Sequence, residues 1–134
     1  MNLRELRELA RFLIVGLSNT LIGLLVIYIA KWAFHANDVL ANAIGYAVGI
    51  VVSFNLNSRW TFAYRGEQRS AFFRFLLVAL VAYGANLLTV LIAIHQVGLN
   101  SYLAQALGIP VYTVVSYFAS KYFVFRARGT SLPR

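Results

Sequence analysis

The chain has 134 residues, of which 60% are hydrophobic and 12% are charged, and its formal net charge is +8 at pH 7. Soluble domains carry about 25% charged residues, so this composition argues against a water-soluble fold of this size. The chain contains no cysteine, which excludes a disulfide framework, a thiolate metal site and a cysteine nucleophile.

Long uncharged stretches predict the helices in chain order. Phe12–Ala30 supplies 19 uncharged residues and Val39–Ser58 supplies 20, and about 20 apolar residues cross a hydrocarbon core as a helix. The 46 uncharged residues between Arg74 and Lys121 are enough for two more helices joined by a turn near residues 95–100. We therefore expect an all-α membrane protein with four transmembrane helices and short connecting loops.

A cleaved signal peptide is the alternative for the first apolar stretch, because Arg4, Arg7 and Arg11 precede it as a basic leader region would. Phe12–Phe34 is longer than the roughly 7 to 15 apolar residues of such a leader, and Glu5 lies among the arginines. We expect this stretch to stay in the protein as the first helix.

The basic residues are distributed unevenly along the chain. Eleven of the 12 Lys and Arg residues lie before the first predicted helix, between the second and the third, or after the fourth, whereas Lys31 lies on the other side. Because cytoplasmic loops of membrane proteins are enriched in Lys and Arg, we expect a multi-pass protein of the inner (plasma) membrane with both termini in the cytoplasm.

The two halves of the sequence align without a gap at an offset of 63 residues, so that Arg11 corresponds to Arg74. From Arg11 to Gly66, 21 of the 56 aligned positions are identical. We predict a single domain, residues 1–134, built from two two-helix repeats at about residues 11–66 and 74–129. Each repeat contains two spans, so both are expected to have the same orientation, unlike the inverted repeats of many transporters.

The second predicted helix carries a small or polar residue at every fourth position: Gly45, Gly49, Ser53, Asn57 and Thr61. Residues four apart share one face of a helix, so this stripe predicts close approach of another helix, with Ser and Asn able to bond across. The fourth helix repeats the pattern imperfectly, and its Ser116 corresponds to Ser53.

Asn19, Thr20 and Asn55 also lie within predicted spans, where lipid would leave their polar groups without hydrogen bonds. We expect these side chains to face protein or a wet groove. Two interpretations stay open, namely hydrogen bonds between helices and a polar path for the headgroup of a lipid.

Aromatic and basic residues lie together where the second and fourth helices end, in Asn57-Ser-Arg-Trp-Thr-Phe62 and Ser120-Lys-Tyr-Phe-Val-Phe125. Such segments suit a membrane surface, where rings lie among headgroups and cations meet phosphate. They either anchor the helices or bind a phosphate, for which the planar fork of arginine is well shaped. In the second case the basic groups of the site are Arg11, Arg59, Arg74 and Lys121.

Several function classes lack support. The predicted spans contain no Asp or Glu, which argues against the proton-coupled export of organic cations by small multidrug exporters. No carboxylate pair, nucleophile with a base, or glycine-rich phosphate loop is present, so we expect no enzymatic activity, no metal and no cofactor. The basic residues flank membrane spans, which makes lipid phosphate a nearer anion than nucleic acid.

The order and spacing of these motifs resemble the GtrA-like family of small four-helix membrane proteins. The segments that carry the resemblance are Arg11-Phe-Leu-Ile-Val-Gly-Leu-Ser-Asn-Thr20, Ala41-Asn-Ala-Ile-Gly45, Ser53-Phe-Asn-Leu-Asn-Ser-Arg-Trp-Thr-Phe62, Arg74-Phe75 and Ser116-Tyr-Phe-Ala-Ser-Lys-Tyr-Phe-Val-Phe125. The resemblance implies translocation of a polyprenyl-phosphate-linked sugar from the cytoplasmic to the outer leaflet. There a separate glycosyltransferase would use the sugar for cell-envelope polysaccharide.

The resemblance also implies site residues, namely Asn19, Thr20, Asn57, Arg59 and Trp60. Together with the residues above, it predicts that Arg59, Arg74 and Lys121 bind the phosphate. The predicted groove for the headgroup comprises Asn19, Thr20, Ser53, Asn55, Asn57, Trp60 and Ser116. The competing hypothesis is a non-transporting membrane adaptor that anchors or stabilises a partner glycosyltransferase. Four helices are few to enclose a headgroup path, which favours a homo-oligomer.

Overall fold

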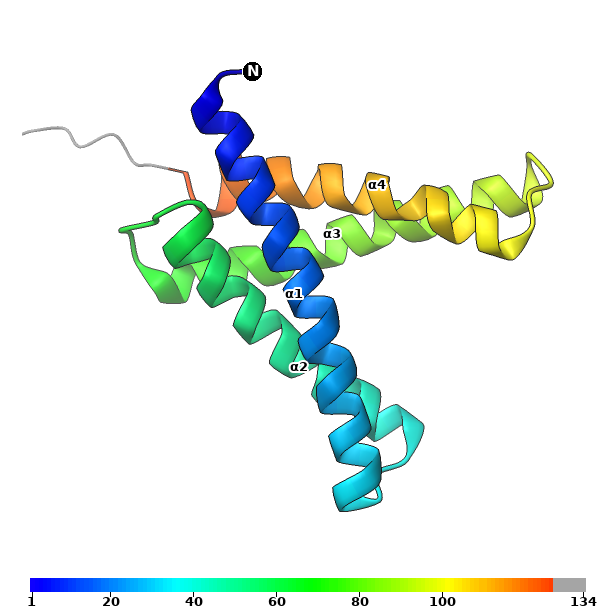
Figure 1. Cartoon of the computed structure of the whole chain (residues 1–134). Helices are drawn as coiled ribbons and strands as arrows, with labels where there is room; N and C mark the ends of the chain where they lie inside the picture. The colour runs from blue at the N-terminus through cyan, green and yellow to red at the C-terminus, as the bar shows by residue number, and fades with distance from the viewer. Residues whose placement is uncertain (127–134) are drawn as a thin grey trace, which may run out of the picture. The chain divides into compact units, whose positions relative to one another are not determined.

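The computed structural model of the chain describes residues 1–126, and all regular secondary structure in this range is helical (Figure 1). The helices are α1 (Leu3–Phe34), α2 (Asp38–Leu56), the π-helical turn η1 (Asn57–Thr61), α3 (Gln68–His95), α4 (Ser101–Ala119) and the π-helical turn η2 (Ser120–Val124). Within residues 1–126, four stretches are long and apolar enough to cross a membrane, namely Leu3–Phe34, Asp38–Thr61, Gln68–His95 and Ser101–Val124. The prediction of an all-helical protein with four spans is confirmed.

The end of the predicted second repeat, residues 127–129, lies outside the described residues, as do the basic residues Arg128 and Arg134. The chain divides into two compact units, Met1–Ala63 and Tyr64–Arg134. In the first, α1 packs against α2 and η1, and in the second, α3 packs against α4 and η2 (Figure 1). We call these units the first and the second hairpin.

The helix bounds of the two hairpins correspond. α4 begins and ends 63 residues after α2, and η2 begins and ends 63 residues after η1. This is the offset at which the sequence aligns with itself. The correspondence supports the predicted internal duplication, which we retain as a proposal.

α1 starts well before the first apolar stretch because a capping box closes its N-terminus. The Asn2 side chain accepts a hydrogen bond from the Glu5 backbone N–H at 2.9 Å, and the Glu5 carboxylate accepts one from the Asn2 N–H at 3.1 Å. Two of the N–H groups that a helix start leaves unpaired are thereby satisfied. The helix therefore includes Arg4, Arg7 and Arg11, which at spacings of three and four residues lie on one side of it.

Asparagine side chains begin the second helix of each hairpin. Asn37 accepts a hydrogen bond from the Leu40 N–H at 2.8 Å, and Asn100 accepts one from the Leu103 N–H at 2.9 Å. Both are preferred N-cap residues, and they explain why the connections between helices are as short as predicted. The connection in the first hairpin is also held by an ion pair between Lys31 and Asp38.

The predicted stripe of small residues packs as expected. Gly45 and Gly49 are buried, and a Cβ atom built on Gly45 would lie 2.6 Å from Ile27 Cγ1 and 3.2 Å from the Gly23 carbonyl oxygen. In the second hairpin, a Cβ atom on Gly108 would overlap with the Asn86 side chain. Each hairpin thus brings its two helices together at a glycine, and the predicted close packing is confirmed.

The interior of each hairpin consists largely of small side chains. Four alanines are fully buried, namely Ala41, Ala71, Ala82 and Ala104. Large apolar side chains such as Leu17, Leu21 and Leu80 are instead more than 60% exposed. In a bilayer such a surface meets hydrocarbon, which is as apolar as leucine, so the helices associate by close packing rather than by the hydrophobic effect.

Replacing Gly45 with leucine is expected to destabilise the first hairpin by about 1–3 kcal/mol, because the new side chain would force α1 and α2 apart. Thermal unfolding of the purified protein in detergent, followed by circular dichroism, measures the effect. Gly16→Leu is the matched control, since nothing lies within 4 Å of a Cβ atom at Gly16. Equal melting temperatures for the two variants would contradict the packing described here.

Candidate functional site

The second helix of each hairpin widens at its C-terminal end. The Phe62 N–H donates to the Asn57 carbonyl oxygen at 2.9 Å, and the Phe125 N–H donates to that of Ser120 at 2.9 Å, so both bonds span five residues. Such π-helical turns are rare and are frequent at functional sites. The two motifs were predicted to lie at helix ends, and the widened turns are a further feature of the candidate site.

A chain of side-chain hydrogen bonds holds the turn η1. The Thr61 hydroxyl donates to Asn57 Oδ1 at 2.9 Å, and Asn57 Nδ2 donates to Ser53 Oγ at 3.3 Å. Asn57 is 2% exposed, so both ends of its amide are used within the helix. These three residues of the predicted stripe therefore stabilise the turn that carries Arg59 and Trp60.

The cations on the two turns have different surroundings. Arg59 is exposed, and within residues 1–126 its guanidinium has no hydrogen-bond or ion-pair partner; the adjacent Trp60 is 41% exposed. Lys121 is half-buried, with its ammonium 5.9 Å from the centre of the Tyr117 ring and 5.7 Å from that of Tyr122. Ring faces attract cations at these distances. Arg59 is thus available to an anion, whereas Lys121 already contacts two aromatic rings.

The other two predicted phosphate-binding residues contact the ends of these turns. Arg11 Nη1 donates to the Trp60 carbonyl at 3.1 Å, and its guanidinium lies 5.3 Å from the centre of the Trp60 ring. Arg74 Nη2 donates to the Val124 carbonyl at 3.0 Å and to the Tyr64 hydroxyl at 3.3 Å. Helix C-termini leave carbonyl groups unpaired and carry partial negative charge. Arg11 and Arg74 therefore stabilise the ends of η1 and η2.

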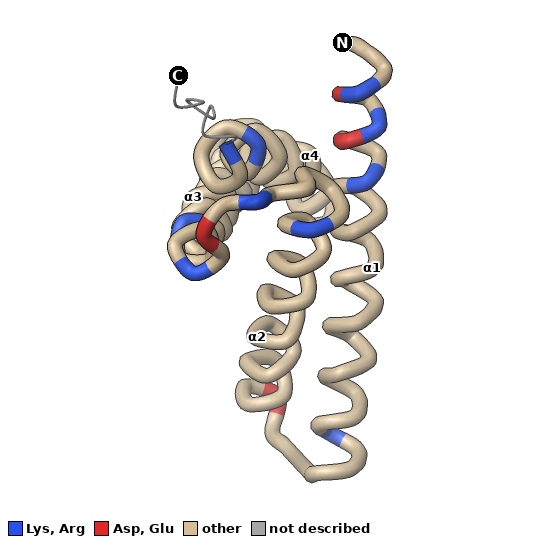
Figure 2. The backbone as a smooth tube through the Cα atoms, turned by 90° about the vertical axis from the view of Figure 1, so that its left-hand side faces the viewer, with Lys and Arg blue, Asp and Glu red and all other residues tan. Residues whose placement is uncertain are grey.

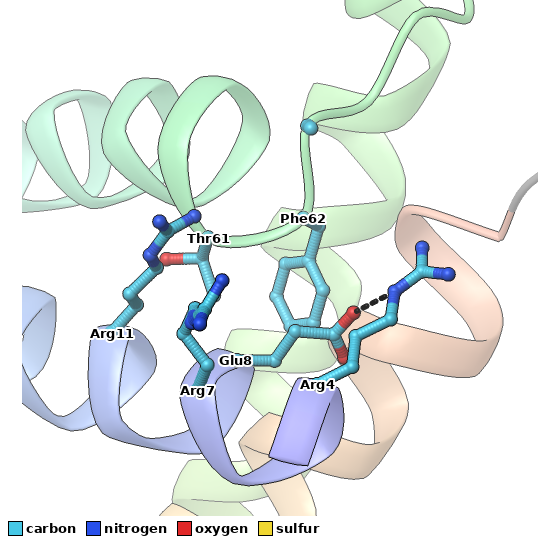
Figure 3. A pocket seen from close by; sticks show the side chains of 7 residues that line it. Arg4, Arg7, Glu8, Arg11, Thr61 and Phe62 are labelled. Atoms are coloured by element: carbon cyan, nitrogen blue, oxygen red, sulfur yellow. Dashed lines mark ion pairs between the residues drawn. The ribbon is translucent and has the colours of Figure 1, made fainter. Parts of the chain in front are cut away.

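The first hairpin has a pocket of about 300 Å³ at the same end. It is lined by Arg4, Arg7, Glu8 and Arg11 of α1 and by Thr61, Phe62 and Ala63, which follow one another at the end of η1. Figure 3 shows the side chains of Arg7 and Arg11 extending from α1 toward Thr61. At the opposite end of this hairpin, Figure 2 shows blue and red segments near the connection between α1 and α2, where Lys31 and Asp38 form an ion pair.

Three residues of the pocket are absent from the predicted site, namely Arg4, Arg7 and Glu8. In the sequence, the first arginines indicate only the orientation of the chain. Their spacing would have indicated a shared helical face once a helix start at Asn2 was recognised. That start is marked in the sequence by Asn2 followed three residues later by Glu5, as in other capping boxes.

The polar residues predicted to line a groove differ in their placement. Asn19 lies against Gly49, and its Oδ1 atom is buried with no hydrogen-bond partner among the described residues. Thr20 and Asn55 are exposed, and their side chains donate to the Gly16 carbonyl at 3.1 Å and the Val51 carbonyl at 2.8 Å. Asn19 thus lies between α1 and α2, while Thr20 and Asn55 bond to their own helices on the outer surface.

In the second hairpin, Ser116 is 7% exposed. Within residues 1–126, no three His, Asp or Glu side chains gather closely enough to hold a metal ion.

Comparisons with known proteins concern most of the chain. The family described as "GtrA/DPMS, transmembrane domain" matches residues 11–125. The "Uncharacterized membrane protein YngA" of Bacillus subtilis (strain 168) is 34% identical over 85 residues, which cover 63% of this chain and 57% of that protein. The "Bactoprenol-linked glucose translocase" of Shigella phage SfX is 35% identical over 57 residues, 42% of this chain and 48% of that protein.

The chain thus spans about half the length of these curated relatives. No solved structure matches it. The family match and the four apolar helices identify a multi-pass membrane protein.

Removing the arginines that bond to the turns is expected to lower stability in a defined order. Arg74→Ala loses two hydrogen bonds at a half-buried position, for about 1.5–3 kcal/mol, and Arg11→Ala loses one bond and a ring contact, for about 1 kcal/mol. Arg59→Ala, at an exposed position, should stay within about 0.5 kcal/mol of the wild type. Thermal unfolding in detergent measures all three variants, and a loss for Arg59→Ala as large as that for Arg74→Ala would contradict this assignment.

Proposed function

This chain belongs to the GtrA/DPMS transmembrane domain family, and from that premise we propose that it translocates a polyprenyl-phosphate-linked monosaccharide. The lipid-linked sugar would move from the cytoplasmic to the outer leaflet, where a separate glycosyltransferase uses it to modify cell-envelope polysaccharide. The name of the phage relative, a bactoprenol-linked glucose translocase, supports this class of substrate. The proposal assigns the chain a transport role and no catalytic one.

The observation that carries the proposal is the exposed Arg59 beside Trp60, on a widened turn at the end of an apolar helix. A phosphosugar headgroup cannot enter hydrocarbon cheaply, since a buried anion without partners costs several kcal/mol or more. A cation at the membrane boundary lowers this cost by binding the phosphate before the headgroup enters the protein. The polyprenyl tail can stay in the lipid throughout.

The contacts of the four predicted phosphate-binding residues differ, and these differences support different roles for them. We propose Arg59 and Lys121 as the phosphate contacts on the two turns, and Arg11 and Arg74 as residues that position these turns while keeping further N–H donors for the ligand. The buried Oδ1 of Asn19 supports a role for this amide toward sugar hydroxyls.

The remaining groove residues divide by accessibility. We propose that Thr20, Asn55 and Trp60, which are exposed, contact the headgroup directly. Ser53 and Asn57 contribute through the hydrogen bonds that hold η1. Ser116 is proposed as a groove residue of the second hairpin, as the sequence analysis predicted.

We further propose that the basic helix ends face the cytoplasm, because basic loops are retained on that side. The connection with Lys31 and Asp38 then faces outward, and the protein lies in the inner (plasma) membrane. Each hairpin exposes long rows of apolar side chains. These surfaces suit both lipid and further copies of the chain, which supports a homo-oligomer that encloses the headgroup path.

Translocation is tested in liposomes that contain the purified protein and a fluorescent polyprenyl-phosphate-linked glucose. Wild type is expected to accelerate movement of the lipid between leaflets, and Arg59→Ala with Lys121→Ala to reduce the acceleration at least about tenfold, because two phosphate contacts are lost. Arg65→Ala with Arg69→Ala removes the same charge at other exposed positions and should leave the rate unchanged.

Two results would overturn the proposal in different ways. No acceleration by folded wild type would favour the adaptor that anchors or stabilises a glycosyltransferase. Acceleration that survives loss of Arg59 and Lys121 would keep the activity and remove these residues from its site.

Orientation is tested with single cysteines, since the natural chain has none. A cysteine in place of Gln96 is expected to react with a membrane-impermeant maleimide in right-side-out vesicles, and one in place of Gln68 to react only in inverted vesicles. Both positions are exposed. The reverse pattern would place both termini outside the cytoplasm.

A further inference from the structure

The pocket of the first hairpin contains two cations, Arg4 and Arg7, that have no role in the proposed function. Three guanidinium groups, those of Arg4, Arg7 and Arg11, line it together with the single carboxylate of Glu8. Glu8 forms an ion pair with Arg4 at 3.7 Å. Arg7 has no hydrogen-bond or ion-pair partner in the part of the chain that the structure describes. Arg11 uses one N–H on the Trp60 carbonyl, and a guanidinium carries five.

The other wall of the pocket, residues 61–63, offers no side-chain hydrogen-bond donor to an anion. The Thr61 hydroxyl donates to Asn57 and is not available to an anion. Phe62 contributes an aromatic ring, and Ala63 has a left-handed backbone with φ of 46°. Left-handed backbone in a residue other than glycine is strained and is concentrated at binding sites and turns. The chain is thus held in an unfavourable conformation where it closes the pocket.

The second hairpin differs at the corresponding positions. At the offset of 63 residues, Arg4 corresponds to Glu67 and Arg7 to Ser70, and the Ser70 hydroxyl donates to the Glu67 carboxylate at 3.1 Å. Tyr64 contacts the residues that correspond to Arg11 and Phe62: its hydroxyl accepts from Arg74, and its ring lies 5.5 Å from that of Phe125. The second hairpin thus has a carboxylate and a hydroxyl in place of Arg4 and Arg7, and a phenol bonded to the arginine that corresponds to Arg11.

We propose that the pocket of the first hairpin binds the phosphate group of a lipid, with Arg7 as the principal ligand and Arg4 and Arg11 beside it. Paired guanidinium groups match phosphate oxygens in geometry and charge. A volume of about 300 Å³ holds a phosphate with part of the group attached to it. The identity of the lipid as a polyprenyl phosphate, with or without its sugar, rests on the proposed function.

The position of the pocket along α1 argues for a lipid rather than a soluble phosphate. Arg11 is the last charged residue before 19 uncharged ones, so the pocket lies within two or three turns of the hydrocarbon. Lipid phosphates lie at this boundary. A phosphate bound here can therefore keep its tail in the bilayer beside the exposed apolar side chains of α1, such as Leu13 and Leu17.

The experiment measures binding of radiolabelled farnesyl phosphate to the full chain in detergent. A Trp32→Phe background leaves Trp60 as the single tryptophan, and its fluorescence reports on Arg11, which lies over its ring. Farnesyl phosphate is expected to bind and to change this fluorescence. Arg7→Ala should weaken binding at least tenfold, and Arg7→Lys less.

Control variants separate the pocket from net charge. Arg69→Ala removes the same charge outside the pocket and should change affinity less than twofold. Glu8→Gln should strengthen binding, because it removes the carboxylate that faces the anion and holds Arg4. Circular dichroism of each variant confirms that it is folded.

Competing ligands identify which part of the lipid is recognised. Farnesol should not compete, and inorganic phosphate should compete only at least tenfold more weakly than farnesyl phosphate. Equal competition by inorganic phosphate would replace the lipid with a soluble phosphate, and competition by farnesol would replace the phosphate site with an apolar one. Binding that survives Arg7→Ala without changing Trp60 fluorescence would overturn the proposal.

The experiments distinguish a failure of the proposed pocket from a failure of the proposed translocation. If farnesyl phosphate binds as described but the protein moves no lipid-linked sugar in liposomes, the pocket stands and the proposed translocation falls. If wild type translocates and Arg7→Ala does so at the same rate with the same affinity, the translocation stands and the pocket falls.

Discussion

In each hairpin, an arginine side chain on one helix donates a hydrogen bond to a backbone carbonyl at the C-terminal end of the other helix. The ends of both hairpins depend on this bond. At the end of η1 this is Arg11 on the Trp60 carbonyl, and at the end of η2 it is Arg74 on the Val124 carbonyl. These carbonyls have no donor within their own helix, and hydrocarbon offers none. At the boundary Arg11 and Arg74 supply this donor, and each bond joins the two helices of a hairpin where the chain is most polar.

Packing contacts hold most of the rest of each hairpin, beside the ion pair between Lys31 and Asp38 in the first. Glycines at positions 45 and 108 let the helix backbones approach, and many of the large apolar side chains face outward. Such an arrangement is stable in lipid, where burying a leucine against protein gains little over leaving it in hydrocarbon. Polar groups are concentrated at one end of the first hairpin, at the turn η1 and the first turns of α1.

The two hairpins have the same backbone features but differ in the accessibility of their basic side chains. Both have an asparagine cap, a glycine contact, a widened turn and an arginine that bonds to it. The first presents an open basic pocket and an exposed Arg59, whereas in the second Tyr64 covers Arg74 and aromatic rings surround Lys121. We interpret this difference as a division of labour in which the first hairpin presents most of the cations that are accessible to the phosphate of the lipid, and the second contributes Lys121.

The sequence by itself determined the four apolar helices and the glycine contacts, because hydrocarbon forces apolar stretches into helices and small residues into their interfaces. It also located the basic turns around Arg59 and Lys121. It did not place the start of α1, which lies at Leu3 and not at Phe12. The widened turns, the capping role of Arg11 and Arg74, and the pocket with Arg4 and Arg7 were decided by the tertiary structure. These features depend on which helices pack together and on the rotation of α1 about its axis, which directs its arginines toward Thr61. The spacing of residues along a single helix determines neither the pairing nor the rotation.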